Sequence, residues 1–114
     1  MPPFEWHLKF ALQMAEMAER ESSRNAWVAC HAVLRAFEEV IDAYCASEDL
    51  HFHDDYPIKA WEKRTQWLSS KTCLLDEWNR IQKLCASANQ SDTAQMLNIL
   101  KGRLAKMTAR TEGF

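Results

Sequence analysis

The chain has few of the residues that make turns and no stretch that is suited to crossing a membrane. Glycine occurs twice and proline three times in 114 residues, and two of the prolines are Pro2 and Pro3. An all-β fold needs more turns than these residues supply. The one long apolar stretch, residues 26–46, carries four full charges, which is incompatible with a membrane span. The first twenty residues mix apolar and charged side chains, so we expect no signal peptide.

Several catalytic and cofactor-binding motifs are also missing. Neither glycine stands where a helix begins, which argues against a phosphate-binding glycine loop. The sequence has no GxSxG motif, no catalytic cysteine signature and no paired helical carboxylates of the di-iron type. We therefore expect no resident cofactor, and we expect the enzyme classes that such motifs identify to be excluded.

The four cysteines form no CxxC pair. They are Cys30, Cys45, Cys73 and Cys85, and each lies on or near an apolar helical stripe. Free cysteine in such a position behaves as a small buried apolar residue, and unpaired thiols are typical of a reducing compartment. We therefore expect a cytoplasmic protein that does not enter a membrane.

Apolar residues recur every three or four positions along most of the chain, which indicates helices. The pattern predicts an all-α, five-helix up-and-down bundle in one domain, residues 1–114, with residues 110–114 fraying. The expected helices cover residues 4–21, 24–46, 57–69, 72–88 and 92–108. Ser22 and Ser23 offer a cap for the second helix, and Asp92 with Gln95 resembles a capping box for the fifth.

The second helix is expected to be central because it is apolar around most of its circumference. Its polar side chains, His31, Arg35, Glu38, Glu39 and Asp42, project into one narrow sector. The polar stripe within this sector continues back to the helix start and contains Arg24, His31, Arg35, Glu38 and Asp42. If neighbouring helices or a second subunit cover this polar stripe, its charges must be paired. Otherwise the stripe is a solvated surface.

Two of the outer helices have a clear apolar stripe that predicts their buried face. In residues 4–21 the predicted buried side chains are Trp6, Phe10, Met14, Met17 and Ala18. In residues 57–69 they are Ile58, Trp61, Thr65 and Leu68.

The two halves of the chain carry opposite charge. Residues 1–56 contain four Lys or Arg against eleven Asp or Glu, and residues 57–114 contain ten against five. Oppositely charged hairpins attract when they pack together, but a basic second half also suits an acidic partner. Lys59, Lys63, Arg64 and Trp67, with the basic residues of the last helix, are candidates for a nucleic-acid surface. The pI near 6.1 argues against it, so we expect a solvated helix face, with Trp67 packed at the edge of the core.

The connection after the second helix contains candidate metal ligands, His51, His53, Asp54 and Asp55. Imidazoles and carboxylates are ligands for divalent transition metals such as zinc, iron or nickel. A structural site usually needs four ligands in closed geometry, and no helix offers a matching HxxxH or ExxH pair. The alternative is a polar loop whose aspartates cap the next helix.

Arg24 and His31 form a second candidate site. They stand seven residues apart, so they lie almost on one line of the helix. Together they suit contact with a phosphate and removal of a proton from a ribose hydroxyl. The alternative is an ordinary surface or partly buried histidine near Arg35.

The chain is expected to contain a long second helix, then a connection with histidine, and then a basic helix rich in tryptophan. This order of elements resembles the HEPN superfamily. The resemblance implies a small helical bundle that dimerises, either a ribonuclease of a toxin or defence system or a non-catalytic partner of a nucleotidyltransferase. The family's catalytic signature is an Arg, four to six residues that begin with a polar one, and a His. Arg24, Asn25 and His31 match it, but in an earlier helix than in the family, which favours the non-catalytic class.

Large apolar side chains are abundant for so small a domain. The chain has five tryptophans, five phenylalanines and five methionines. Surplus apolar surface marks interfaces, which favours a homodimer. We therefore expect a dimeric module that binds a partner protein or a second copy. RNA is expected as a ligand only if the chain is a ribonuclease.

Overall fold

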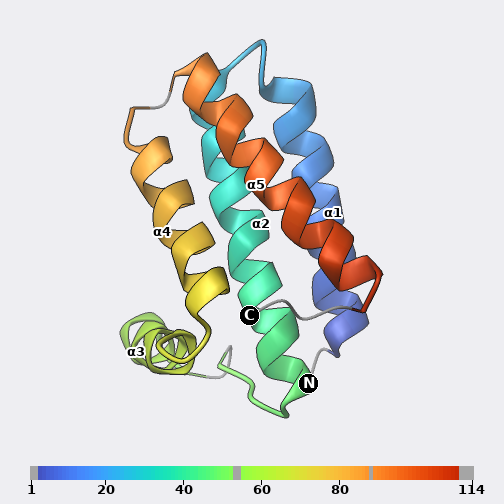
Figure 1. Ribbon diagram of the computed structural model, residues 1–114, viewed down its shortest axis with the longest axis vertical. Coiled ribbons are helices and arrows are strands. Elements are labelled where there is room, and N and C mark those ends of the chain that lie inside the picture. Colours follow the sequence, from blue (N-terminus) through green and yellow to red (C-terminus); the bar gives the residue numbers. More distant parts are fainter. Residues whose placement is uncertain (1–2, 53–54, 88, 111–114) are drawn as a thin grey trace.

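The chain folds into an all-α bundle. The computed structural model describes residues 3–52, 55–87 and 89–110, and these residues form helices and connections without a strand (Figure 1). The helices are α1 (Phe4–Glu21), α2 (Ala26–Ser47), α3 (Pro57–Leu68), α4 (Thr72–Cys85) and α5 (Gln90–Thr108). The predicted fold class is confirmed, and the helix ends lie close to the predicted positions.

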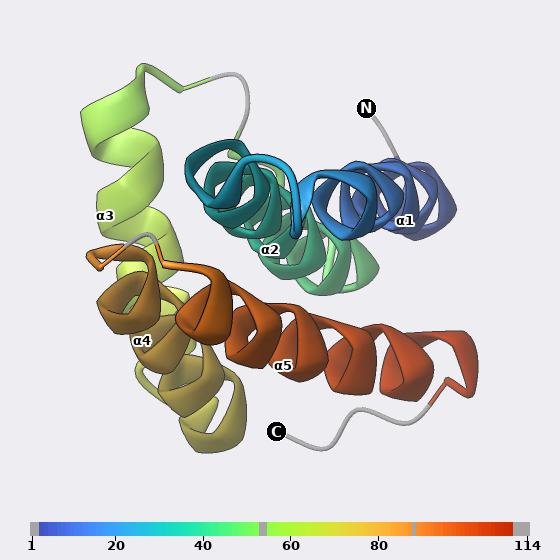
Figure 2. The ribbon, with the colours of Figure 1, turned by 90° about the horizontal axis from the view of Figure 1, so that it is seen from above.

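Most of the helices run along the long axis of the molecule, and α3 lies across one end. Figure 1 shows α1, α2, α4 and α5 from the side and α3 end-on. From above, α1 and α2 lie on one side, and α4 and α5 lie on the other (Figure 2). The predicted up-and-down arrangement is not confirmed, because α3 turns away from the common direction.

The central position of α2 is confirmed. This helix contacts α1, α4 and α5. Twelve of its 22 residues are buried, among them Val33, Phe37 and Ile41 with no exposed surface. A helix that is apolar around most of its circumference needs such cover on several sides.

The helix α1 packs through small residues rather than through its large apolar stripe. Its buried residues are His7, Ala11, Ala15 and Ala18, while Trp6 remains 49% exposed. Of the predicted buried face, Ala18 is buried, Met14 and Met17 are partly buried against the core and Phe10 is partly buried, so the prediction is wrong for Trp6. Small side chains on facing helices allow close approach of the two backbones. This close approach places His7 against α2.

The helix α3 is turned differently from the prediction. It buries Ala60, Arg64 and Leu68. Of the predicted face, Leu68 is thus confirmed and Trp61 is partly buried against the core, whereas Thr65 is exposed and Ile58 is 71% exposed. The apolar stripe was the wrong guide because the inward face includes a charged residue whose partner lies on α2. Pro57 opens the helix at a position where its missing N–H removes no helical hydrogen bond.

Asparagines cap the second and fifth helices. The Asn25 side chain accepts a hydrogen bond from the Val28 backbone N–H at 3.2 Å, and Asn89 accepts one from the Asp92 backbone N–H at 2.8 Å. The serine and aspartate caps expected from the sequence were wrong, because both helices begin at different residues from those assumed. Asparagine is as good an N-cap as serine or aspartate.

The last described residues pack back on α1. The Arg110 guanidinium lies 2.9 Å from the Glu5 carboxylate, so this residue is held rather than frayed. Residues 111–114, for which fraying was also expected, lie outside the described residues. Within the described parts of the chain, none of the helices combines the length and apolar character that a membrane span requires.

Candidate functional site

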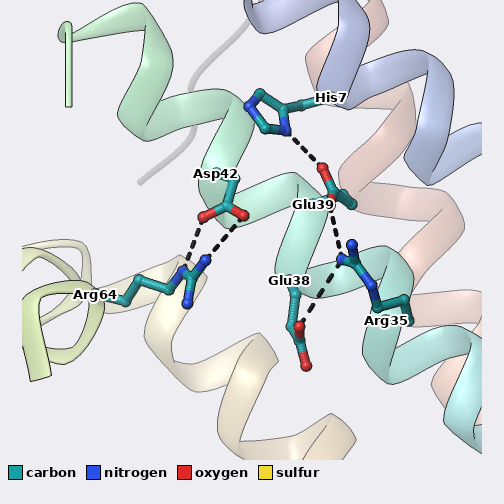
Figure 3. A network of polar contacts seen from close by, with 6 residues as sticks. All are labelled: His7, Arg35, Glu38, Glu39, Asp42 and Arg64. Atoms are coloured by element: carbon teal, nitrogen blue, oxygen red, sulfur yellow. Dashed lines mark hydrogen bonds and ion pairs between the residues drawn. The ribbon is translucent and has the colours of Figure 1, made fainter. Parts of the chain in front are cut away.

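The polar stripe of α2 faces a recess between α1 and α3. Figure 3 shows His7 from α1 and Arg64 from α3 pointing toward Glu39 and Asp42 of α2. The recess has a volume of about 290 Å³ and is lined by Trp6, His7, Arg35, Glu38, Glu39, Asp42 and Arg64. Three of the five stripe residues predicted from the sequence therefore meet here, and neighbouring helices supply two further charged or polar partners.

His7 and Arg35 hold the Glu39 carboxylate from two sides. His7 Nδ1 donates a hydrogen bond to Glu39 Oε2 at 2.5 Å, and Arg35 contacts Glu39 Oε1 at 2.7 Å. Both His7 and Glu39 are almost fully buried. Burial alone would raise the pKa of Glu39, but the hydrogen bond from His7 and the charge of Arg35 outweigh it and lower the pKa. Glu39 is therefore a buried, ionised anchor between α1 and α2.

Asp42 and Arg64 form the second half of the recess. Arg64 Nε and Nη2 donate to the two carboxylate oxygens of Asp42 at 2.8 and 3.1 Å. The Arg64 guanidinium also lies over the Trp61 ring, 4.8 Å from its centroid. This two-pronged geometry is the strongest that an arginine makes with a carboxylate. It fastens α3 to α2.

Glu38 is the least compensated carboxyl of the recess. Its nearest guanidinium nitrogen, on Arg35, is 3.8 Å away. Burial is the largest influence and raises the pKa of Glu38. The charges of Arg35 and Arg64 lower this pKa, the carboxylates of Asp42 and Glu39 raise it, and the net shift is upward. Burial thus favours the protonated form of Glu38, in contrast to Glu39.

The charged groups of the recess are paired with one another. Glu39 contacts Arg35 and Asp42 contacts Arg64, so a charged ligand must displace an internal pair. These pairs hold α1 and α3 against α2.

Arg24 and His31 have separate partners at the start of α2. The Arg24 side chain is 75% exposed and lies 3.9 Å from the Glu21 carboxylate. His31 Nδ1 donates to the Trp27 carbonyl oxygen at 2.8 Å, and its exposed ring stacks against Trp27 with centroids 4.2 Å apart. Both side chains are accessible, and their assignment to a ribonuclease site stays a prediction.

The predicted metal loop is only partly described. His53 and Asp54 lie outside the described residues. His51 Nε2 lies 3.3 Å from Asp49, and the Asp55 carboxylate accepts a hydrogen bond from Lys63 at 2.8 Å. That hydrogen bond lowers the pKa of Asp55. The structure thus gives Asp55 a lysine partner, and the metal assignment of the loop stays a prediction.

The candidate nucleic-acid surface is wrong for two of its arginines, Arg64 and Arg103. Arg64 is buried against Asp42, and Arg103 of α5 is 1% exposed. Arg103 donates to both carboxylate oxygens of Glu77 at 2.7 Å and to the Tyr44 hydroxyl at 3.3 Å. Both guanidinium groups therefore neutralise internal acids and are not presented to a phosphate backbone.

Sequence reasoning missed His7 and Arg64 as members of the site. It placed Glu39 in the polar sector of α2 but not in the line of candidate residues, which included its neighbour Glu38 instead. His7 shares a spacing of three and four with the alanines of α1, a signal that the larger Trp6 and Phe10 obscured. Arg64 stands four residues after Ala60 and four before Leu68, which is the only pattern that points it inward.

Two groups of side chains in the described parts of the chain bring three possible metal-ligand atoms within 4.8 Å of one another. One is His7, Glu39 and Asp42, which lies beside two guanidinium groups that already neutralise its carboxylates. The other is Cys30, His31 and Cys85, which has sulfur ligands and no ion pair. Neither group was predicted from the sequence.

Comparison with known proteins adds no relative. No protein-family model matches the chain, and no curated protein or solved structure shows a significant match. The resemblance to the HEPN superfamily therefore stays a prediction, and function has to be inferred from the side chains themselves.

Proposed function

We propose that this protein is a non-catalytic interaction module that pairs with a second copy of itself through the outward face of α3. The observation that carries the proposal is an uncovered apolar hollow on this helix. The hollow has a volume of about 590 Å³ and is lined by Pro57, Ile58, Trp61, Glu62 and Thr65. Ile58 is 71% exposed and Tyr56, just before the helix, is 65% exposed.

A contiguous patch of solvent-exposed apolar side chains indicates an interface far better than isolated exposed apolar residues do. Tyr56, Pro57 and Ile58 are consecutive, and Trp61 lies one turn further along α3. Aromatic side chains at the centre of such a patch are typical of the residues that carry binding energy. The patch is therefore a better interface candidate than the isolated exposed Leu12 on α1.

The face is also held firmly from behind. Arg64 ties α3 to Asp42 of α2, and the Trp61 ring stacks on Trp78 of α4 with centroids 5.5 Å apart. A surface that is already fixed loses little conformational freedom on binding, which favours affinity. The buried pair is thus a support for the proposed interface.

The chemistry of the face suits a second copy of the same helix. Lys59 and Glu62 are both exposed and stand three residues apart on α3, and Glu62 itself lines the apolar hollow. In a two-fold contact the same patch meets itself in opposite direction. Lys59 of each copy then approaches Glu62 of the other while the Ile58 side chains enter the facing hollows.

The test is a mass measurement in solution over a range of concentrations, by light scattering after gel filtration. We expect a species of twice the 13.3 kDa chain mass. Ile58→Asp should shift it to the mass of one chain, because a carboxylate is buried without a partner in the contact. Leu12→Asp, at a 43% exposed site on α1, is the matched control and should leave the dimer intact.

Two outcomes would overturn the proposal. One is a wild-type mass of a single chain at every concentration. The other is a dimer that survives Ile58→Asp but is lost with Leu12→Asp, which would place the contact on α1. Circular dichroism of each variant checks that the helices remain folded.

A further inference from the structure

A second cluster of reactive side chains lies away from the recess, where the first turns of α2 meet the end of α4. Cys85 is the last residue of α4, and its Sγ lies 2.7 Å from Sγ of Cys30 on α2. His31 Nδ1 lies 3.3 Å from Cys30 Sγ. Two thiols and an imidazole from two helices therefore converge on one point.

The burial of the three side chains differs in a way that suits an ion-binding site. Cys30 has no exposed surface and Cys85 is 9% exposed, whereas His31 is exposed. The sulfur atoms thus lie in an apolar setting, and the imidazole connects them to the solvent. The exposed His31 is therefore the side of the cluster from which an ion reaches the two sulfur atoms.

We propose that Cys30, Cys85 and His31 bind one zinc ion. Thiolate and imidazole are the ligands that zinc prefers, and three protein ligands with one open position is an established zinc geometry. The inference does not depend on the self-association of α3, because the two sites share no residue.

The distances require only local adjustment. With zinc–sulfur bonds of about 2.3 Å and zinc–nitrogen bonds of about 2.0 Å at tetrahedral angles, sulfur and nitrogen ligands lie about 3.5 Å apart and two sulfurs about 3.8 Å apart. The Cys30–His31 separation already fits within a few tenths of an ångström, and the two sulfurs must move apart by about 1 Å. Rotation of the Cys85 side chain at the end of its helix supplies such a movement.

The proton balance of binding follows from the free protein. Cys30 Sγ and His31 Nδ1 both donate to the Trp27 carbonyl oxygen, at 3.2 and 2.8 Å. When zinc binds, each thiol releases its proton to water, and the neutral imidazole gives up the Nδ1 proton that it donates to Trp27 and takes one from water on Nε2, which leaves Nδ1 to bind the metal. Trp27 stacks on the imidazole and keeps the ring beside the sulfur atoms.

Zinc is favoured here over the His7, Glu39 and Asp42 group because of the surrounding charge. Arg35 and Arg64 stand within 2.8 Å of those carboxylates, so a divalent cation must compete with two guanidinium groups. Among the described residues, Cys30, Cys85 and His31 take part in no ion pair. Their electrostatic surroundings leave room for a positive ion.

The test uses the full chain, purified without a histidine tag, reduced and freed of metal with a chelator. Zinc is titrated against a coloured competing chelator, and cobalt(II) serves as a spectroscopic probe for sulfur ligands. We expect one zinc per chain, sulfur-to-cobalt charge-transfer absorption, and protection of two of the four cysteines from alkylation.

Variants separate this site from the other cysteines. Cys85→Ser and His31→Asn should each weaken zinc binding at least tenfold, and more for the cysteine. Cys73→Ser removes an exposed cysteine of the same helix and should leave the affinity unchanged. His31 is exposed, so His31→Asn folds normally and keeps the test decisive even if a cysteine variant does not.

Three results would overturn the assignment. The first is a zinc content well below the expected one ion per chain. The second is a zinc affinity that His31→Asn leaves unchanged. The third is recovery of Cys30 and Cys85 as a disulfide after incubation with excess zinc, which would show that the pair reacts with oxidant instead of holding the metal.

Discussion

The pair of Arg64 and Asp42 gives the sharpest prediction about how the polar stripe is held. The Arg64 side chain is 10% exposed and that of Asp42 is 13% exposed, so each charge depends on the other. Replacing Arg64 by Met keeps most of its apolar length but leaves the Asp42 carboxylate without its two hydrogen bonds. Breaking a buried pair in this way costs about 3–5 kcal/mol, and the remaining water contact reduces the expected loss here to about 2–4 kcal/mol.

The double variant Arg64→Met with Asp42→Leu tests the reason for that loss. It removes both charges, so no group is left without a partner. Apolar replacement of a whole buried pair is often neutral. We therefore expect the double variant to recover most of the stability, to within about 1.5 kcal/mol of the wild type. This recovery is a property of a buried pair and would not occur for two independent surface charges.

The measurement is urea unfolding followed by circular dichroism at neutral pH, with all free energies extrapolated in the same way. Arg24→Ala, at a 75% exposed side chain of the same stripe, is the control and should change the free energy by less than about 0.5 kcal/mol. A loss below that same limit for Arg64→Met would refute the reasoning. So would a double variant that loses as much as the two single variants together.

Two further predictions concern the other buried charges. Because the His7 hydrogen bond and Arg35 lower the pKa of Glu39 in the folded state from 4.5, this carboxylate contributes stability above pH 4.5 that is lost as the pH falls through the lowered value. Glu39 faces His7 of α1 and Glu38 and Arg35 of its own helix. Glu39→Gln should therefore flatten the acid side of the stability profile measured by urea unfolding. An unchanged profile would reject the contribution of Glu39. Burial opposes the charge of Arg103, but its bonds to Glu77 and Tyr44 outweigh this and raise its pKa. Glu77→Ala should cost about 2–4 kcal/mol of unfolding free energy, whereas Glu19→Ala, at a 59% exposed side chain, should cost less than about 0.5 kcal/mol; equal losses would contradict the buried role of Arg103.

The helices could be predicted from the sequence because their signal is local. The spacing of apolar residues fixes where a helix forms, and the almost continuous apolar circumference of α2 identifies it as the central one. The asparagine caps were missed because several polar residues compete at each break. Asn25 and Asn89 are the caps because α2 and α5 begin directly after them, and residue type alone does not distinguish them from the neighbouring polar residues.

The orientation of the outer helices was harder to predict because it depends on which face fits α2. On α1 a line of alanines packs more closely than the stripe that contains Trp6. On α3 an inward arginine turns Ile58 toward the solvent. Composition and period treat large apolar residues as core, and they fail where a small residue or a paired charge fits better.

The members of the two polar clusters come from distant parts of the chain. His7 and Glu39 are 32 residues apart, and Cys30 and Cys85 are 55 residues apart. Spacing along one helix predicted Arg35, Glu38 and Asp42 but had no means of finding partners on other helices. Such partners are determined by how the helices pack, which a single sequence does not display.

The most direct test of the central proposal, that α3 pairs with its own copy in opposite direction, is an exchange of the two charges beside Ile58. Lys59→Glu and Glu62→Lys should each weaken the homodimer, because two like charges then meet at both ends of the contact. When the two variants are mixed, with one of them isotopically labelled, native mass spectrometry should show mainly the mixed dimer, in which every acid again faces a base. A statistical distribution of dimers, or no dimer from either variant or their mixture, would contradict the antiparallel α3 interface.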